Sequence, residues 1–84
     1  MIRKEFTLPE KLPISRAFAT ELAQTAGKFA SRIMIENERT IVNGKSLLGL
    51  LSLYDAIDKP MQLTVDGPDE EEAAKAVLTM LGLL

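Results

Sequence analysis

Ser46 stands where the sequence could carry a phosphate. It follows Asn43, Gly44 and Lys45, and it precedes a leucine-rich stretch. An Asn-Gly pair is a strong turn signal, and a serine before an apolar stretch is a typical helix N-cap. The free N–H groups at the start of a helix attract anions. Phosphate on Ser46 would add about −1.5 to −2 charges that these groups and Lys45 could receive; without phosphate, Ser46 simply caps the helix.

Ser15 is a second serine with this placement. It lies at the start of a helical pattern that runs to about Ala26 or Gly27, and Arg16 follows it. We expect Ser15 to be an N-cap, which together with Arg16 could bind an anion weakly. An unactivated serine is a poor nucleophile at neutral pH, so the position favours capping over chemistry.

The chain contains no histidine and no cysteine. The missing histidine excludes an imidazole general base, a Ser-His-Asp triad, a histidine metal site and phosphohistidine. The missing cysteine excludes disulfides, thiolate chemistry and cysteine zinc sites, and it favours a cytosolic location. The missing histidine thereby removes a large share of enzyme chemistry. We expect a protein that is not an enzyme and that uses no cofactor and no metal.

The composition of the chain excludes further classes of function. The 84 residues are 46% hydrophobic and 26% charged, with a net charge of −2, as in one soluble globular domain. This balance offers no basic field for nucleic acid, and no apolar run approaches the roughly 20 residues of a membrane span. The acidic residues at 66 and 69–72 lack the spacing of an EF-hand loop. The end of a P-loop is imitated at 44–46, but Arg39 stands where that motif needs glycine.

The leucines after Ser46 are too many for one buried stripe. Those at positions 47, 48, 50 and 51 span more than half of a helix circumference, so some must be exposed and a partner surface is expected. Leu50 and Leu53, with Ile57 beyond, fit the buried side. The alternative is that all five leucines belong to the core.

Alternation and helical spacing predict seven elements. Strands are expected at 2–8, 32–36, 40–43 and 61–65, with a proline-bracketed loop at 9–13 and a turn at 37–39. Helices are expected from Ser15 to about Gly27, from Ser46 to about Tyr54, and from an Asp69 cap onward. The last helix is expected to bury Ala73, Ala76, Val77, Met80, Leu81 and Leu84. The order β-α-β-β-α-β-α predicts an α+β fold, an open-faced two-layer sandwich.

This order and three sequence blocks resemble the HPr family, the histidine-containing phosphocarriers of the bacterial sugar phosphotransferase system. The blocks lie at 24–29, 42–53 and 67–70, and the middle one is the most specific. The resemblance covers the whole chain. It implies a single domain over residues 1–84, with a four-stranded antiparallel sheet and three helices on one face.

The chain departs from the family where the family does its chemistry. The active loop of the family falls on residues 13–18, where Ser15 replaces the phosphorylated histidine, Ala17 replaces an arginine and Phe18 replaces a proline. Arg16 stands one place early, which on a helix is a rotation of about 100°. A serine phosphate ester is kinetically inert, unlike a phosphoramidate on imidazole, so a phosphoryl relay through Ser15 is not expected.

The resemblance implies a regulatory role instead. Ser46 matches the serine that a dedicated kinase phosphorylates in firmicute members of the family, and Leu47, Leu48 and Leu51 match an exposed docking patch. The implied partner surface consists of Arg16, Thr20, Lys45, Leu47, Leu48 and Leu51. The implied partners are proteins, namely an HPr serine kinase/phosphatase and a transcriptional regulator of carbon catabolite control, with no nucleic acid and no membrane.

Two alternatives stay open. One is a residual phosphocarrier or a competitor within the phosphotransferase system, with Ser15 as acceptor or with the protein occupying the docking site of a transferase enzyme. The other is a plain interaction domain without phosphorylation, a monomer or a weak homodimer through the leucine patch.

Overall fold

The computed structural model describes residues 1–7, 15–38, 40–53 and 60–83. Within these ranges four strands and three helices alternate in the predicted order. The elements, in chain order, are β1 (Ile2–Thr7), α1 (Arg16–Gly27), β2 (Arg32–Glu36), β3 (Ile41–Asn43), α2 (Leu47–Leu51), β4 (Pro60–Asp66) and α3 (Glu70–Met80).

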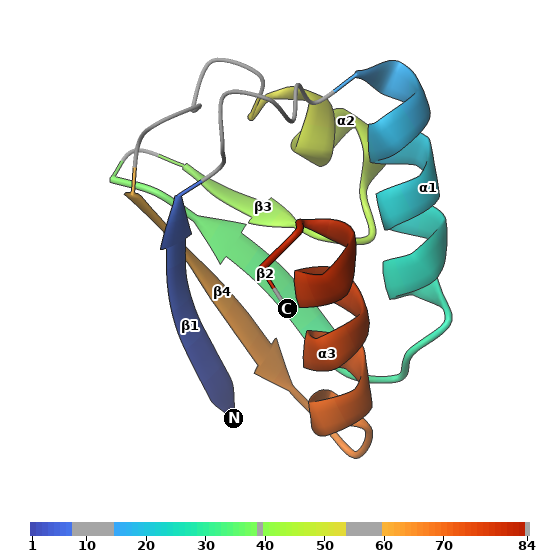
Figure 1. Cartoon of the computed structure of the whole chain (residues 1–84), viewed down its shortest axis with the longest axis vertical. Coiled ribbons are helices and arrows are strands. Elements are labelled where there is room, and N and C mark those ends of the chain that lie inside the picture. Colours follow the sequence, from blue (N-terminus) through green and yellow to red (C-terminus); the bar gives the residue numbers. More distant parts are fainter. Residues whose placement is uncertain (8–14, 39, 54–59, 84) are drawn as a thin grey trace.

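The strands form one antiparallel sheet in the order β1-β4-β2-β3. Because strand side chains alternate between the two faces, one face is apolar and buried. The buried strand residues are Phe6, Ile33, Ile35, Val42, Met61, Leu63 and Val65. The helices lie against this face, with α1 and α3 side by side, and the other face stays open (Figure 1). The α+β open-faced sandwich expected from the sequence is confirmed.

Helix α1 buries a narrow stripe of small and medium side chains. Its buried residues are Ala19, Leu22 and Ala26, at the spacing of three and four residues that defines one helix face. Ser15 caps its start as predicted, and Lys28 is the C-cap residue. Helix α1 packs against both α2 and α3 and so connects these two helices within the helical layer.

Helix α3 buries a face rotated from the predicted one. Its buried residues are Ala73, Ala74, Val77, Leu78 and then Leu81. Ala76 and Met80, predicted to be in the core, are half-buried. Positions i, i+1, i+4, i+5 and i+8 form one stripe as well as positions i, i+3, i+4 and i+7 do. Packing against α1, β1 and β4 decides between them.

Some predicted features differ or lie outside the described residues. Helix α2 ends at Leu51 instead of near Tyr54, because Ser52 and Leu53 already form a turn. Asp69 is the N-cap residue of α3 as predicted, but its carboxylate makes no capping bond. The remaining predictions concern the loop at 9–13, Leu8, Arg39, Tyr54, Ile57 and Leu84, which all lie outside the described residues.

Candidate functional site

A tight turn brings Ser46 to the start of α2. The Asn43 side-chain oxygen accepts a hydrogen bond from the Lys45 backbone N–H at 2.8 Å, and the Asn43 carbonyl accepts one from the Ser46 N–H at 2.9 Å. The Gly44 N–H donates to the Ile33 carbonyl at 2.8 Å. A Cβ on Gly44 would lie 2.6 Å from Ile33 Cγ2. The turn therefore requires glycine at position 44 so that its backbone can approach β2.

Ser46 is the N-cap of α2, as predicted. Its Oγ accepts a hydrogen bond from the Gly49 N–H at 3.1 Å, and its carbonyl accepts one from Leu50 N–H at 3.0 Å. The residue has extended backbone angles and is half-buried. A side-chain oxygen in this position satisfies one of the free N–H groups of the helix start.

Lys45 is held by the end of α1. Its Nζ donates a hydrogen bond to the Phe29 carbonyl at 2.7 Å, in a partly buried position. From the sequence we expected Lys45 to be available to a phosphate on Ser46. In the structure its ammonium group is bonded to another element, so a phosphate would have to compete for it.

The leucines of α2 and its end divide between the core and the surface. Leu50 and Leu53 are 0% and 2% exposed, whereas Leu48 is 80% exposed. Leu47 and Leu51 are half-buried and pack against the edge of the core. The alternative that all five leucines belong to the core is therefore wrong. The large exposed side chain of Leu48, flanked by two half-buried leucines, forms an apolar patch, which we call the leucine patch (Leu47, Leu48 and Leu51).

The start of α1 lies beside α2 (Figure 1). Ser15 is exposed, and its Oγ accepts a hydrogen bond from the Phe18 N–H at 3.1 Å. Arg16 is exposed, and its carbonyl accepts a hydrogen bond from Thr20 Oγ1 at 2.8 Å. The fold thus places both N-cap serines in neighbouring helices of the same layer.

Asp69 joins the start of α3 to the loop between α1 and β2, a role the sequence did not indicate. Its carboxylate accepts hydrogen bonds from the backbone N–H groups of Ala30 and Ser31, each at 2.9 Å, and from the Ser31 hydroxyl at 2.5 Å. The bond from the Ser31 hydroxyl, followed by that from the Ala30 N–H, lowers the pKa of Asp69. The sequence signal for this contact is the glycine at position 67, because a Cβ there would lie 2.5 Å from Ser31 Cα.

Glu70 is the acidic group that supports the start of α3. Its Oε1 accepts a hydrogen bond from the Gly67 N–H at 3.4 Å, and its Oε2 lies 2.8 Å from the Met1 amino group. These contacts, the amino group first, lower the pKa of Glu70. The N-cap residue Asp69 and the first helical residue Glu70 thus both contact other segments of the chain.

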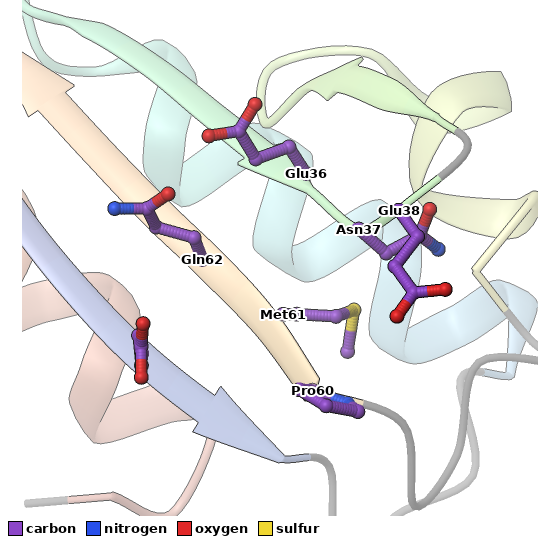
Figure 2. A pocket seen from close by; sticks show the side chains of 7 residues that line it. Glu36, Asn37, Glu38, Pro60, Met61 and Gln62 are labelled. Atoms are coloured by element: carbon purple, nitrogen blue, oxygen red, sulfur yellow. The ribbon is translucent and has the colours of Figure 1, made fainter.

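The open face of the sheet carries a shallow acidic hollow of about 240 Å³. Glu5, Gln62 and Glu36 are neighbours across β1, β4 and β2, and Glu38 lies at the same end. Figure 2 shows Glu36, Glu38 and Gln62 around this hollow. Among the described residues no group of three or more acidic, histidine or cysteine side chains is placed to hold a metal ion. In the same ranges no helix is long and apolar enough to cross a membrane.

Comparison with known proteins matches nearly the whole chain. A family model described as the PTS HPr component phosphorylation site matches residues 2–82. The phosphocarrier protein HPr of Cupriavidus necator is 32% identical over 81 residues, which are 96% of this chain and 91% of that protein. The HPr-like protein Crh of Halalkalibacterium halodurans is also 32% identical over 81 residues, 96% of each chain. The crystal structure of HPr-C-His from Thermoanaerobacter tengcongensis matches with a TM-score of 0.85 at 33% identity, over 98% of this chain and 92% of that one.

Proposed function

Because the chain belongs to the HPr family of the bacterial phosphotransferase system, we propose that it is a regulatory binding module that receives phosphate on Ser46 and presents it with the leucine patch to a protein partner. HPr proteins are phosphocarriers and not enzymes, and this chain has no histidine to carry a phosphoryl group. We place its action in the cytoplasm.

The observation that supports this proposal is the position of Ser46 beside the leucine patch. Ser46 Oγ caps α2 at 3.1 Å from Gly49 N, and Leu48, two residues on, is 80% exposed. Phosphorylation transfers the γ-phosphoryl group of ATP to Ser46 Oγ, with release of ADP and of the hydroxyl proton. The product is a stable ester that adds about −1.5 to −2 charges next to an apolar surface. A partner with a cationic group beside an apolar pocket would then distinguish the two forms.

The partners we propose are an HPr serine kinase/phosphatase, which would add and remove the phosphate, and a transcriptional regulator of carbon catabolite control. The similarity to an HPr-like protein Crh, which in Bacillus subtilis is a catabolite repression protein, supports a regulatory role. Arg16 and Thr20 belong to the proposed partner surface because α1 begins beside α2 and Arg16 is exposed there.

The proposal is tested by intact-mass measurement after incubation with ATP and a bacterial HPr serine kinase. We expect one added phosphate on the native chain and none on Ser46→Ala. Ser15→Ala is the matched variant, because it removes the other N-cap serine, and it should gain one phosphate like the native chain. A native chain that gains nothing from ATP would contradict the proposal and favour a plain interaction domain through the leucine patch.

A parallel reaction tests the carrier alternative. It contains phosphoenolpyruvate and the first enzyme of the phosphotransferase system, with the native chain and Ser15→Ala. We expect no added mass on either protein, because Ser15 Oγ is an unactivated hydroxyl that accepts the Phe18 N–H. A phosphate that arrives on the native chain but not on Ser15→Ala would establish Ser15 as an acceptor and overturn the non-carrier role.

A further inference from the structure

The Phe29 carbonyl lies just past the end of α1, whose C-cap residue is Lys28. The last turn of α1 has no basic side chain of its own, although the carbonyls at a helix C-terminus favour a positive charge. Lys45, from the turn before α2, donates its Nζ hydrogen to the Phe29 carbonyl at 2.7 Å. The side chain of Phe29 packs against the core. The bond therefore ties the Ser46 turn to the point where α1 leaves the helical layer.

The residues that follow are held from the opposite side. The N–H groups of Ala30 and Ser31 donate to the Asp69 carboxylate at 2.9 Å each. The segment at 29–31 thus has one contact to the turn before α2, through Lys45, and another to the start of α3, through Asp69. Loss of the first contact would leave the Asp69 bonds and the core packing of Phe29 to hold the segment.

We infer that phosphate on Ser46 competes with the Phe29 carbonyl for the Lys45 ammonium group and so loosens the segment at 29–31. The inference rests on the proposed phosphorylation of Ser46 and names its effect inside the protein. Lys45 directly precedes Ser46, and a lysine ammonium on its flexible four-carbon stem can rotate its donors to a new acceptor. The phosphate dianion attracts the ammonium group by charge as well as by hydrogen bonding, whereas the neutral carbonyl offers only the hydrogen bond, so the phosphate is favoured.

Release of Lys45 would change a surface far from the phosphate in sequence. The Phe29 carbonyl would lose its partner at the end of α1, and the N–H bonds around it would open more often. The Phe29 N–H donates to the Ala26 carbonyl at 3.2 Å and the Lys28 N–H to the Thr25 carbonyl at 3.2 Å, both long bonds that close the end of α1. The rate at which these two N–H hydrogens exchange with solvent therefore reports whether the bond between Lys45 and the Phe29 carbonyl is formed.

The test uses a chain of 84 residues made by chemical synthesis with phosphoserine at position 46, so that no kinase is required. The Phe29 carbonyl carries a ¹³C label, and its NMR shift reports whether it accepts a hydrogen bond. Amide exchange of Phe29 and Lys28 is measured on the same samples. The comparison proteins are the unphosphorylated chain, Lys45→Met, the phosphorylated Lys45→Met, and Lys75→Met, which removes an exposed lysine from α3 instead.

We expect phosphoserine 46 and Lys45→Met to move the Phe29 carbonyl shift in the same direction. Both should raise amide exchange about threefold to tenfold, the range that loss of one hydrogen bond implies. Phosphate added to Lys45→Met should cause no further change, and Lys75→Met should match the native chain. The inference is overturned if Lys45→Met changes these readouts and phosphoserine does not. It is also overturned if neither phosphoserine 46 nor Lys45→Met changes them, because the bond between Lys45 and the Phe29 carbonyl would then be absent in solution. A kinase that fails to phosphorylate the native chain would contradict the proposed function and leave this result readable.

Discussion

Asp69 and Ser31 are 38 residues apart in the chain, yet the Asp69 carboxylate accepts both the backbone N–H and the hydroxyl of Ser31. Ser31 is fully buried, so its hydroxyl has no access to water. Gly67 makes the approach possible, because any Cβ there would collide with Ser31. This contact fixes the start of α3 against the loop that follows α1.

Asp69→Asn is expected to destabilise the fold. The amide keeps one acceptor oxygen, which can serve both Ser31 donors, but it turns an NH₂ group toward the Ala30 N–H, which then loses its acceptor. Urea unfolding at pH 7 should show a lower midpoint than that of the native chain. Glu71→Gln, the same change of charge at an exposed position of the same helix turn, should unfold close to the native midpoint. Equal midpoints for both variants would show that the Asp69 contacts contribute nothing in solution.

The difference in stability between the native chain and Asp69→Asn is expected to depend on pH. Hydrogen bonds lower the pKa of Asp69 below its ordinary value of 3.8 in the folded state. The stability from this carboxylate is therefore fully present above pH 3.8 and is lost as the pH falls through the folded pKa. Asp69→Asn lacks the titrating group, so the difference in unfolding midpoint should be constant between pH 5 and 7 and should shrink below 3.8. A difference that stays constant to pH 3 would contradict the assignment.

The sequence predicted Asp69 as the cap of α3, and Asp69 is the N-cap residue, but its carboxylate bonds elsewhere for a general reason. Asp69 precedes Glu70, Glu71 and Glu72 at the start of α3, which is a local N-cap pattern. Its actual donors come from Ala30 and Ser31, and no pattern within one helix turn contains them. Contacts between distant segments need the tertiary arrangement and are outside the reach of local spacing.

The strands and the start of α2 were predictable for the opposite reason. Alternation within a few residues placed β2 at its observed bounds, and the turn residues Asn43 and Gly44 with the cap Ser46 marked the entry to α2. The end of α2 was not predictable in this way, because the leucine-rich sequence continues past Leu51 while the backbone turns. The contact of Lys45 with Phe29 was missed too, since a side-chain bond to a backbone carbonyl leaves no sequence pattern.

Gly44→Ala is expected to cost about 1–3 kcal/mol in the free energy of unfolding, the usual range for overpacking. The new Cβ would lie 2.6 Å from Ile33 Cγ2 and 3.3 Å from the Ile33 carbonyl oxygen, so the turn would have to move away from β2. Gly27→Ala provides the comparison, because nothing lies within 4 Å of a Cβ there. It should be neutral or stabilising by up to about 1 kcal/mol, since alanine favours a helix over glycine. Urea unfolding of both variants measures the contrast, and a loss at Gly27→Ala as large as at Gly44→Ala would contradict it.

Ser46→Ala is expected to cost about 1 kcal/mol by loss of the cap, whether or not Ser46 is ever phosphorylated. The Gly49 N–H would lose its acceptor at 3.1 Å. Ser46→Asp should keep most of the stability, because aspartate is also a favourable N-cap and its charge suits the helix start. Thermal or urea unfolding of the three proteins distinguishes these outcomes. If Ser46→Ala unfolds like the native chain, the hydroxyl does not act as a cap in solution.

Leu48 and Leu50 separate partner binding from stability. Leu50→Ala is expected to cost about 2–5 kcal/mol, because Leu50 is 0% exposed and its loss leaves a cavity. Leu48→Ala should stay within about 0.5 kcal/mol of the native chain, since Leu48 is 80% exposed.

If the leucine patch binds a partner, Leu48→Ala should nevertheless weaken binding of the phosphorylated protein to a catabolite regulator by about tenfold, the size of effect that marks an energetically important interface residue. Calorimetry with the phosphorylated native chain and the phosphorylated Leu48→Ala measures this. Ile41→Ala serves as the matched variant, because Ile41 is 65% exposed on the edge strand β3, outside the patch. Binding that Leu48→Ala and Ile41→Ala weaken equally would move the partner surface away from α2, and binding that neither weakens would remove the leucine patch from the proposal.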